Sequence, residues 1–126
     1  MQISYYPKEV MHYLQTLPNS GVLPIESSSV IWGQDGDVSK GLKIRLYLDV
    51  DNGTIKDLRY LVYGNGYFVA AVAKISEVLR GLTLKQAANY NFNKLYENLG
   101  IPANKINDFK VITKLLNNII LQYKGK

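Results

Sequence analysis

The fold is decided between residues 42 and 63, where the chain begins Leu42-Lys43-Ile44-Arg45-Leu46-Tyr47-Leu48-Asp49-Val50. Apolar and polar residues alternate through this run, which predicts a β-strand whose buried face carries Leu42, Ile44, Leu46, Leu48 and Val50. Asn52-Gly53 follows, and this dipeptide is the strongest short signal for a hairpin turn. The stretch therefore predicts two long antiparallel strands, over residues 42–50 and 55–63.

Helices are predicted around this hairpin from apolar residues at helical spacing. Residues 67–80 read as a core-facing helix that ends at Gly81, and residues 109–123 carry the apolar stripe of a long last helix. A short helix opens at Pro7, and two more follow the capping residues Thr83 and Asn91.

The segment before the hairpin divides into a short strand and a turn. Residues 30–32 read as a further strand, whereas the turn residues of 33–37 predict a loop. Strands followed by helices indicate an α+β domain, a small antiparallel meander with helices packed on one face.

The composition limits the possible function classes. At 126 residues we expect a single domain over residues 1–126. No apolar run approaches the roughly 18 residues of a membrane span, and the amino terminus lacks a secretory pattern, so we expect a cytoplasmic protein with no membrane partner. The chain has no cysteine, which excludes a disulfide, a thiolate nucleophile and any site that needs cysteine ligands.

The net charge of +5 is concentrated in the second half of the chain. From Arg80 onward there are eight Lys or Arg residues, against only Glu97 and Asp108. Such a surplus attracts nucleic acid or an acidic partner, or it marks a solvated helix face, which we favour. Tyr47, alongside Lys43 and Arg45 on the polar side of its strand, is the candidate for an exposed aromatic and basic patch.

Three stretches in the right order resemble the IscU/NifU amino-terminal family of iron–sulfur cluster assembly scaffolds. Residues 64–87, which begin Gly64-Asn65-Gly66, follow the family's Gly-Cys-Gly turn, small-residue helix and Thr/Ser-Leu…Ala segment. Residues 101–108 lie over its Leu-Pro-Pro-Val-Lys motif and the Ile-His-Cys that follows. Residues 5–21 resemble its opening helix and Pro-x-Asn-x-Gly turn. The resemblance implies the α+β fold described above and would imply an iron–sulfur cluster, iron or zinc.

The resemblance places the family's ligands on residues without a thiol. These ligand-equivalent positions are Asn65, Asn107, Asp108 and either Asp35 or Ser39. Asp35 follows if Gly36-Asp37 matches the family's Gly-Asp, which makes Asp37 the loop aspartate, and Ser39 follows from an ungapped count. Because clusters require soft thiolate ligands, no cofactor is expected.

The leading hypothesis is a degenerate, non-enzymatic scaffold that acts by binding proteins. In the family a cysteine desulfurase docks near the ligand end, which is the end of the molecule that carries the metal ligands. An assembly chaperone binds the Leu-Pro-Pro-Val-Lys motif. The equivalent partner-binding segment here is Ile101, Pro102, Ala103, Asn104 and Lys105. Bulky Tyr67, Phe68 and Val72 replace small residues of the family, which predicts a filled space beside the ligand-equivalent positions.

Two alternatives remain open. One is a divergent scaffold or iron carrier that uses partner thiols, or Asp35, Asp37 and Asp108 as oxygen ligands of a hard cation. The other, which we favour least, is a basic nucleic-acid-binding domain.

Overall fold

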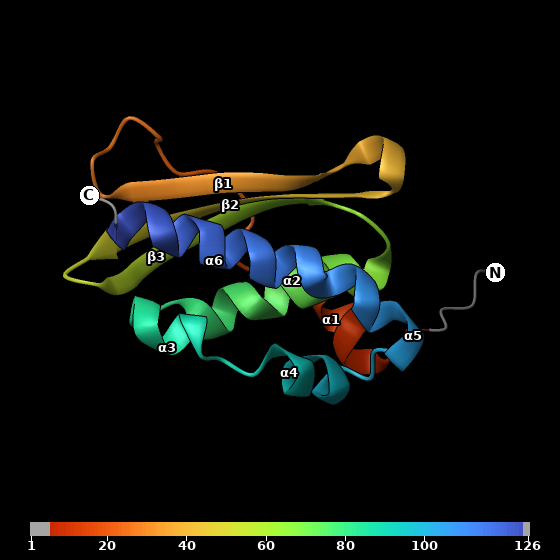
Figure 1. The fold of residues 1–126 in the computed structure, drawn as a ribbon. Helices are drawn as coiled ribbons and strands as arrows, with labels where there is room; N and C mark the ends of the chain where they lie inside the picture. Colours follow the sequence, from red (N-terminus) through yellow and green to blue (C-terminus); the bar gives the residue numbers. More distant parts are fainter. Residues whose placement is uncertain (1–5, 125–126) are drawn as a thin grey trace.

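The chain folds into a three-stranded antiparallel sheet backed by helices (Figure 1). A computed structural model describes the backbone of residues 6–124 and the side chains of residues 6–123. The strands are β1 (Val30–Asp37), β2 (Leu42–Asp51) and β3 (Thr54–Tyr63). The helices are α1 (Lys8–Thr16), α2 (Gly66–Leu79), α3 (Leu84–Ala88), α4 (Phe92–Asn98), α5 (Ala103–Ile106) and α6 (Lys110–Lys124), with 3₁₀ turns η1 (Val38–Lys40) and η2 (Asn107–Phe109). The predicted α+β class is confirmed.

The central hairpin forms where the alternating pattern predicts it. In the antiparallel pairing of β2 with β3, Ile44 lies opposite Val62. Asn52 and Gly53 have positive φ angles of 50° and 77°, the combination that a type I′ turn requires. On the predicted inner face Leu42 is half-buried, and the buried residues are Ile44, Leu46, Leu48 and Val50.

The prediction of a loop over residues 33–37 is wrong, because β1 continues through them. Asp35 lies opposite Ile44, so β2 supplies the backbone pairing that local sequence does not reveal. Gly33 has a packing role in this strand. A Cβ atom there would lie only 3.0 Å from Cδ1 of Leu115 on α6. The glycine that suggests a turn thus permits close approach of a helix.

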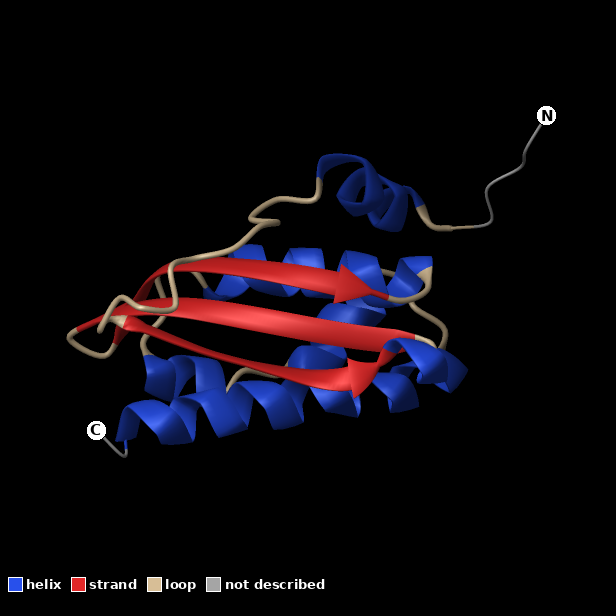
Figure 2. Cartoon of the chain, turned by 90° about the horizontal axis from the view of Figure 1, so that it is seen from above, coloured by secondary structure: helices blue, strands red, loops and turns tan. Residues whose placement is uncertain are grey.

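Two long helices lie directly against the sheet, α6 beneath β1 and α2 beneath β3 (Figure 2). α1 packs against α2 beyond the β3 edge. Ser76 of α2 is the one buried polar residue among those that the structure describes. Its Oγ lies 3.1 Å from the carbonyl oxygen of Pro18 and accepts a hydrogen bond from the Asn19 side-chain amide. These contacts fix the turn after α1 to α2.

Tyr47 lies on the outer face of the sheet, but the prediction that it is exposed is wrong, because the residue is only 3% exposed. Trp32 of β1 stacks against Tyr47 with ring centroids 6.3 Å apart. The Arg45 guanidinium lies 5.3 Å from the centroid of the Trp32 ring. Trp32 therefore covers the face of the Tyr47 ring, and Arg45 in turn lies over Trp32. A nucleic-acid base would need such a ring face free to stack on it.

Candidate functional site

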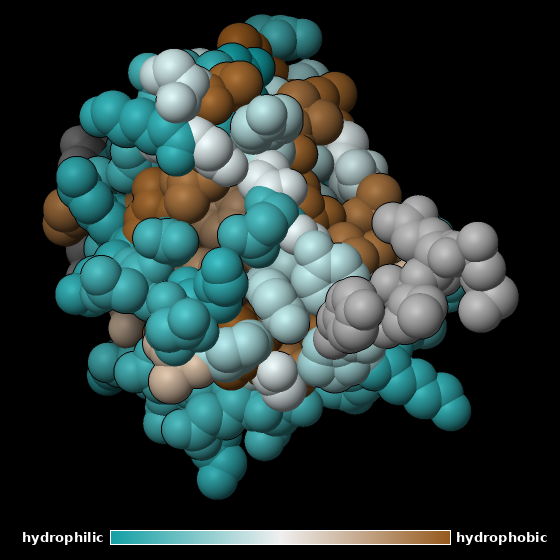
Figure 3. Space-filling view, turned by 90° about the vertical axis from the view of Figure 1, so that its right-hand side faces the viewer, coloured by the Kyte–Doolittle hydropathy of each residue, from teal (hydrophilic) through white to brown (hydrophobic). Residues whose placement is uncertain are grey.

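The ligand-equivalent positions lie in three turns at one end of the molecule, on the right in Figure 1. The first turn comprises η1 and the end of β1, where Asp35 is still paired with β2. The second joins β3 to α2, and the third joins α5 to α6 through η2. Figure 3 faces this end and shows hydrophobic patches set among polar side chains. The fold thus brings segments from both halves of the chain to one end.

Both carboxylates of the first turn bind neighbouring backbone. Oδ1 of Asp35 accepts a hydrogen bond from the Gly36 N–H at 2.7 Å. Oδ1 of Asp37 accepts one from the Ser39 N–H at 3.0 Å and so caps η1. This backbone hydrogen bond is the main reason why the pKa of the Asp37 carboxyl lies below its ordinary value. Asp37 therefore stabilises the turn itself.

Asn65, in the second turn, is the N-cap of α2. Its Oδ1 accepts a hydrogen bond from the Phe68 N–H at 3.0 Å. The N–H of the next residue, Gly66, donates to the Tyr6 hydroxyl at 3.3 Å. A Cβ atom on Gly66 would lie 2.5 Å from Cζ of Tyr6, so the Tyr6 ring lies directly against the glycine backbone. The side chain at the middle ligand-equivalent position thus has a structural role, as a helix cap, that was not predicted from the sequence.

Asn107 and Asp108 lie in the third turn, and both are exposed. Within residues 6–123, no three or more His, Cys, Asp or Glu side chains form a group that could hold a metal ion. The geometry therefore does not support a cation site made by Asp35, Asp37 and Asp108. The donors at the ligand-equivalent positions are amides, carboxylates and a hydroxyl, a set that does not fit an iron–sulfur cluster as cargo.

Aromatic side chains fill the space behind the second and third turns. Phe68 is fully buried, as the bulky start of α2 predicts, and its ring centroid lies 5.6 Å from that of Phe109. The ring of Tyr96 on α4 lies 4.8 Å from Phe109 in an edge-on arrangement. No motif in the sequence points to Tyr96, although Phe92, Tyr96 and Leu99 share the spacing of one helix face.

The segment equivalent to Leu-Pro-Pro-Val-Lys forms the start of α5 on the surface. Ile101 is buried, and Pro102, Ala103, Asn104 and Lys105 are exposed. The carbonyl oxygen of Pro102 accepts a hydrogen bond from the Lys105 N–H at 2.9 Å, which holds the segment as a helical turn. Most of this segment is accessible to another protein.

The model of the NifU-like N-terminal domain matches residues 5–126, which include all three turns. The chain belongs to this family. The match places the whole sheet and every helix within the NifU-like domain, as the resemblance implies.

Similar proteins point the same way. The NifU-like chain is 28% identical over 122 residues to the iron–sulfur cluster assembly scaffold protein IscU of Haemophilus influenzae, covering 96% of this chain and 97% of that protein. It is 27% identical over 125 residues to IscU of Azotobacter vinelandii, covering 98% and 97% respectively.

A solved structure agrees with the fold. It is a crystal structure from Fervidobacterium islandicum AW-1, assigned as an iron–sulfur cluster assembly scaffold protein for the SUF system. The TM-score is 0.68 at 19% identity, covering 91% of this chain and 96% of that one. At this identity the likeness concerns the fold alone.

These findings characterise the NifU-like chain at the level of its family. The family comprises scaffolds of iron–sulfur cluster assembly and is not a family of enzymes, and this member has no cysteine. In the part of the chain that the structure describes, no helix is long and apolar enough to cross a membrane.

Proposed function

We propose that this NifU-like protein is a degenerate scaffold of iron–sulfur cluster assembly, which acts by binding other proteins and cannot hold a cluster by itself. One observation carries the proposal: Asp37 and Asn65 cap backbone N–H groups, while Phe68 and Phe109 fill the volume behind the ligand end. The proposal includes a single domain over residues 1–126, a cytoplasmic location and no catalytic activity.

The proposed partners are a cysteine desulfurase or an assembly chaperone. Two observations support this choice. The relatives are scaffold proteins of cluster assembly, and the segment from Pro102 to Lys105 is exposed at the surface. Protein binding needs only an accessible surface of the right shape and charge, which survives the loss of metal ligands.

Anaerobic incubation with ferrous iron and sulfide tests the loss of cluster binding. We expect the wild-type protein to develop no cluster absorption and to retain no stoichiometric iron. Two matched variants restore three thiols: Asn65→Cys and Asp108→Cys are combined either with Asp35→Cys or with Ser39→Cys. The combination that gains cluster absorption identifies the first ligand position.

The same incubation can overturn the proposal. Stoichiometric iron in the wild type that is lost when Asp35, Asp37 and Asp108 are all changed to alanine would support an oxygen-ligated iron carrier instead.

Binding to the desulfurase and the chaperone from the same host tests the second half of the proposal. Titration calorimetry with each purified partner is expected to give a saturable complex with at least one of them. Lys105→Glu should weaken chaperone binding, whereas Lys40→Glu, an equal charge change in η1, serves as the matched control. Failure of every purified assembly component to bind contradicts the proposal.

A further inference from the structure

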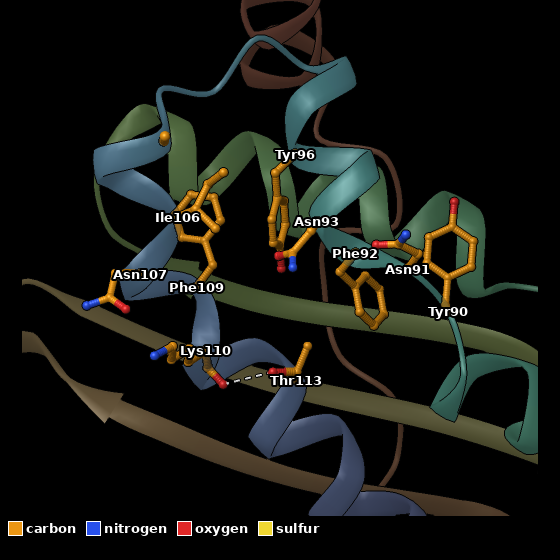
Figure 4. A pocket seen from close by; sticks show the side chains of 11 residues that line it. Tyr90, Asn91, Phe92, Asn93, Tyr96, Ile106, Asn107, Phe109, Lys110 and Thr113 are labelled. Atoms are coloured by element: carbon orange, nitrogen blue, oxygen red, sulfur yellow. Dashed lines mark hydrogen bonds between the residues drawn. The ribbon is translucent and has the colours of Figure 1, made fainter.

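A groove of about 530 Å³ opens between α4 and the segment formed by α5, η2 and the start of α6 (Figure 4). Its aromatic lining comes from both sides: Tyr90, Phe92 and Tyr96 lie on or just before α4, and Phe109 lies in η2. The volume falls within the range of about 300–1,000 Å³ that is usual for ligand pockets. The groove has room for one or two large side chains.

The aromatic wall of the groove contains a hydroxyl group without a partner. Tyr96 is only 2% exposed, and its hydroxyl has no hydrogen-bond partner within the described part of the chain. Figure 4 shows its ring pointing from α4 into the space between Phe109 and Phe92. The hydroxyl itself is buried, so Tyr96 offers a bound chain an aromatic surface and not a hydrogen bond.

Side-chain amides line the mouth of the groove. Asn93 and Asn107 are exposed on opposite sides of it, and neither uses its side chain in a hydrogen bond among the residues described. An amide both donates and accepts hydrogen bonds, as does the backbone of an extended peptide. The mouth therefore suits a polypeptide segment.

The surface around the groove is positively charged. Lys110 lines the groove, Lys105 and Lys114 are exposed on α5 and α6, and Lys94 of α4 lines a neighbouring pocket. None of these lysines forms an ion pair with a carboxylate in residues 6–123. The carboxylates exposed on these elements are Glu97 of α4 and Asp108 of η2, so the lysines outnumber them. The lysines favour a partner with negative charge.

We infer that this groove binds an acidic peptide segment of a partner protein. A large apolar or aromatic side chain of that segment seats against Tyr96 and Phe109, and its carboxylates lie over the flanking lysines. The inference rests on the proposed function, because it specifies the kind of protein that the scaffold binds. A nucleic acid fits less well, since only one lysine lines the groove itself and the mouth is amide-rich.

Selection of random peptides displayed on phage, with the whole protein immobilised, tests the inference without assuming a ligand. We expect the enriched peptides to carry Asp or Glu residues around one aromatic or large aliphatic side chain. In a ¹⁵N-labelled sample, a synthetic copy of an enriched peptide should shift the side-chain amide signals of Asn93 and Asn107. Replacing its apolar residue with glycine should weaken binding by about tenfold or more.

Matched charge reversals locate the site. Lys105→Glu combined with Lys110→Glu should weaken binding of the acidic peptide by about tenfold or more. Lys56→Glu combined with Lys85→Glu makes the same charge change near the hairpin end and should leave the affinity within about twofold of wild type.

The inference would be overturned if the enriched peptides lacked acidic residues, or if both double variants lost peptide affinity equally. It would also be overturned if the peptide shifted amide signals only on other surfaces, or if a single-stranded RNA oligonucleotide bound more tightly than the peptide. Desulfurase binding without peptide binding would refute the groove and leave the proposed function intact. Peptide binding without any assembly partner would do the reverse.

Discussion

Single residues at the ligand end show how positions equivalent to metal ligands have taken structural roles. Asn65 occupies the middle ligand-equivalent position, yet its side chain caps α2 through the Phe68 N–H. Asp37 caps η1 in the same way. The amide at position 65 stabilises a helix start that a cysteine side chain would leave without a strong cap.

Removing the Asn65 cap should cost stability without affecting the core. Asn65→Ala is expected to lower the free energy of unfolding by about 1 kcal/mol, because the Phe68 N–H loses its acceptor. Asn65→Ser keeps an acceptor and should stay close to wild type. Urea denaturation followed by circular dichroism measures both, and equal midpoints for the alanine and wild-type proteins would refute the capping role.

Gly36 is required by its surroundings as well as by its backbone angle. Its φ is +88°, and a Cβ atom there would lie 2.5 Å from the carbonyl oxygen of Leu42. Gly41 has a similar φ of +93° but nothing within 4 Å of such an atom. Gly41→Ala should therefore cost about 1–2 kcal/mol for the left-handed conformation, and Gly36→Ala clearly more.

The same denaturation measurement separates these two glycine effects. Equal losses in the two variants would show that the contact with Leu42 relaxes at no cost, contrary to this interpretation.

At the scale of elements, the close approach of α6 to β1 sets the thickness of this half of the core. Gly33 lets Leu115 and Ile119 of α6 pack directly on the strand backbone. The side-chain amide of Gln122 donates to the Trp32 carbonyl oxygen at 2.9 Å, so α6 also binds the backbone of this strand. The length of β1 and the position of α6 are thus coupled.

Adding side-chain volume at Gly33 should push α6 away from the sheet. Gly33→Val is expected to destabilise the protein by about 1–3 kcal/mol through overpacking against Leu115 and Ile119. Gly33→Ala adds one methyl group and should cost less. Thermal unfolding of the two variants compares these costs. A valine variant as stable as wild type would mean that the helix shifts without loss of packing.

At the scale of the whole molecule, two tyrosine hydroxyls are buried in the core without partners among the described residues, those of Tyr60 and Tyr96. Burial raises the pKa of Tyr60 to about 12 from its ordinary value of 10 and raises the pKa of Tyr96 as well. Below pH 10 both groups are neutral in the folded and unfolded states alike. Above pH 10 the unfolded chain loses these protons first, so stability falls as the pH rises.

Alkaline denaturation should therefore depend on Tyr60. Between pH 10 and pH 12 its ionisation lowers the free energy of unfolding by about 1.4 kcal/mol per pH unit. Tyr60→Phe should reduce this slope and cost little at neutral pH, because the hydroxyl has no partner. The exposed Tyr63 provides the control, and Tyr63→Phe should keep the wild-type slope. Urea unfolding at several pH values supplies the comparison.

Local sequence signals determined much of this protein. Alternation and Asn-Gly predicted the hairpin, apolar periodicity predicted α2 and α6, and the lack of cysteine excluded a thiolate site. These signals succeed because each depends on residues close together in the chain. The family resemblance extended them to the whole fold and to the three turns at the ligand end.

Only the tertiary structure decided what depends on partners distant in the sequence. β2 extends β1 through residues 33–37, Trp32 covers Tyr47, and α4 meets η2 to form the groove. The same is true of the ligand end, where Phe68 and Phe109 come from segments far apart in the chain. Pairing and packing across the chain set the environment of each side chain, and no local pattern records that environment.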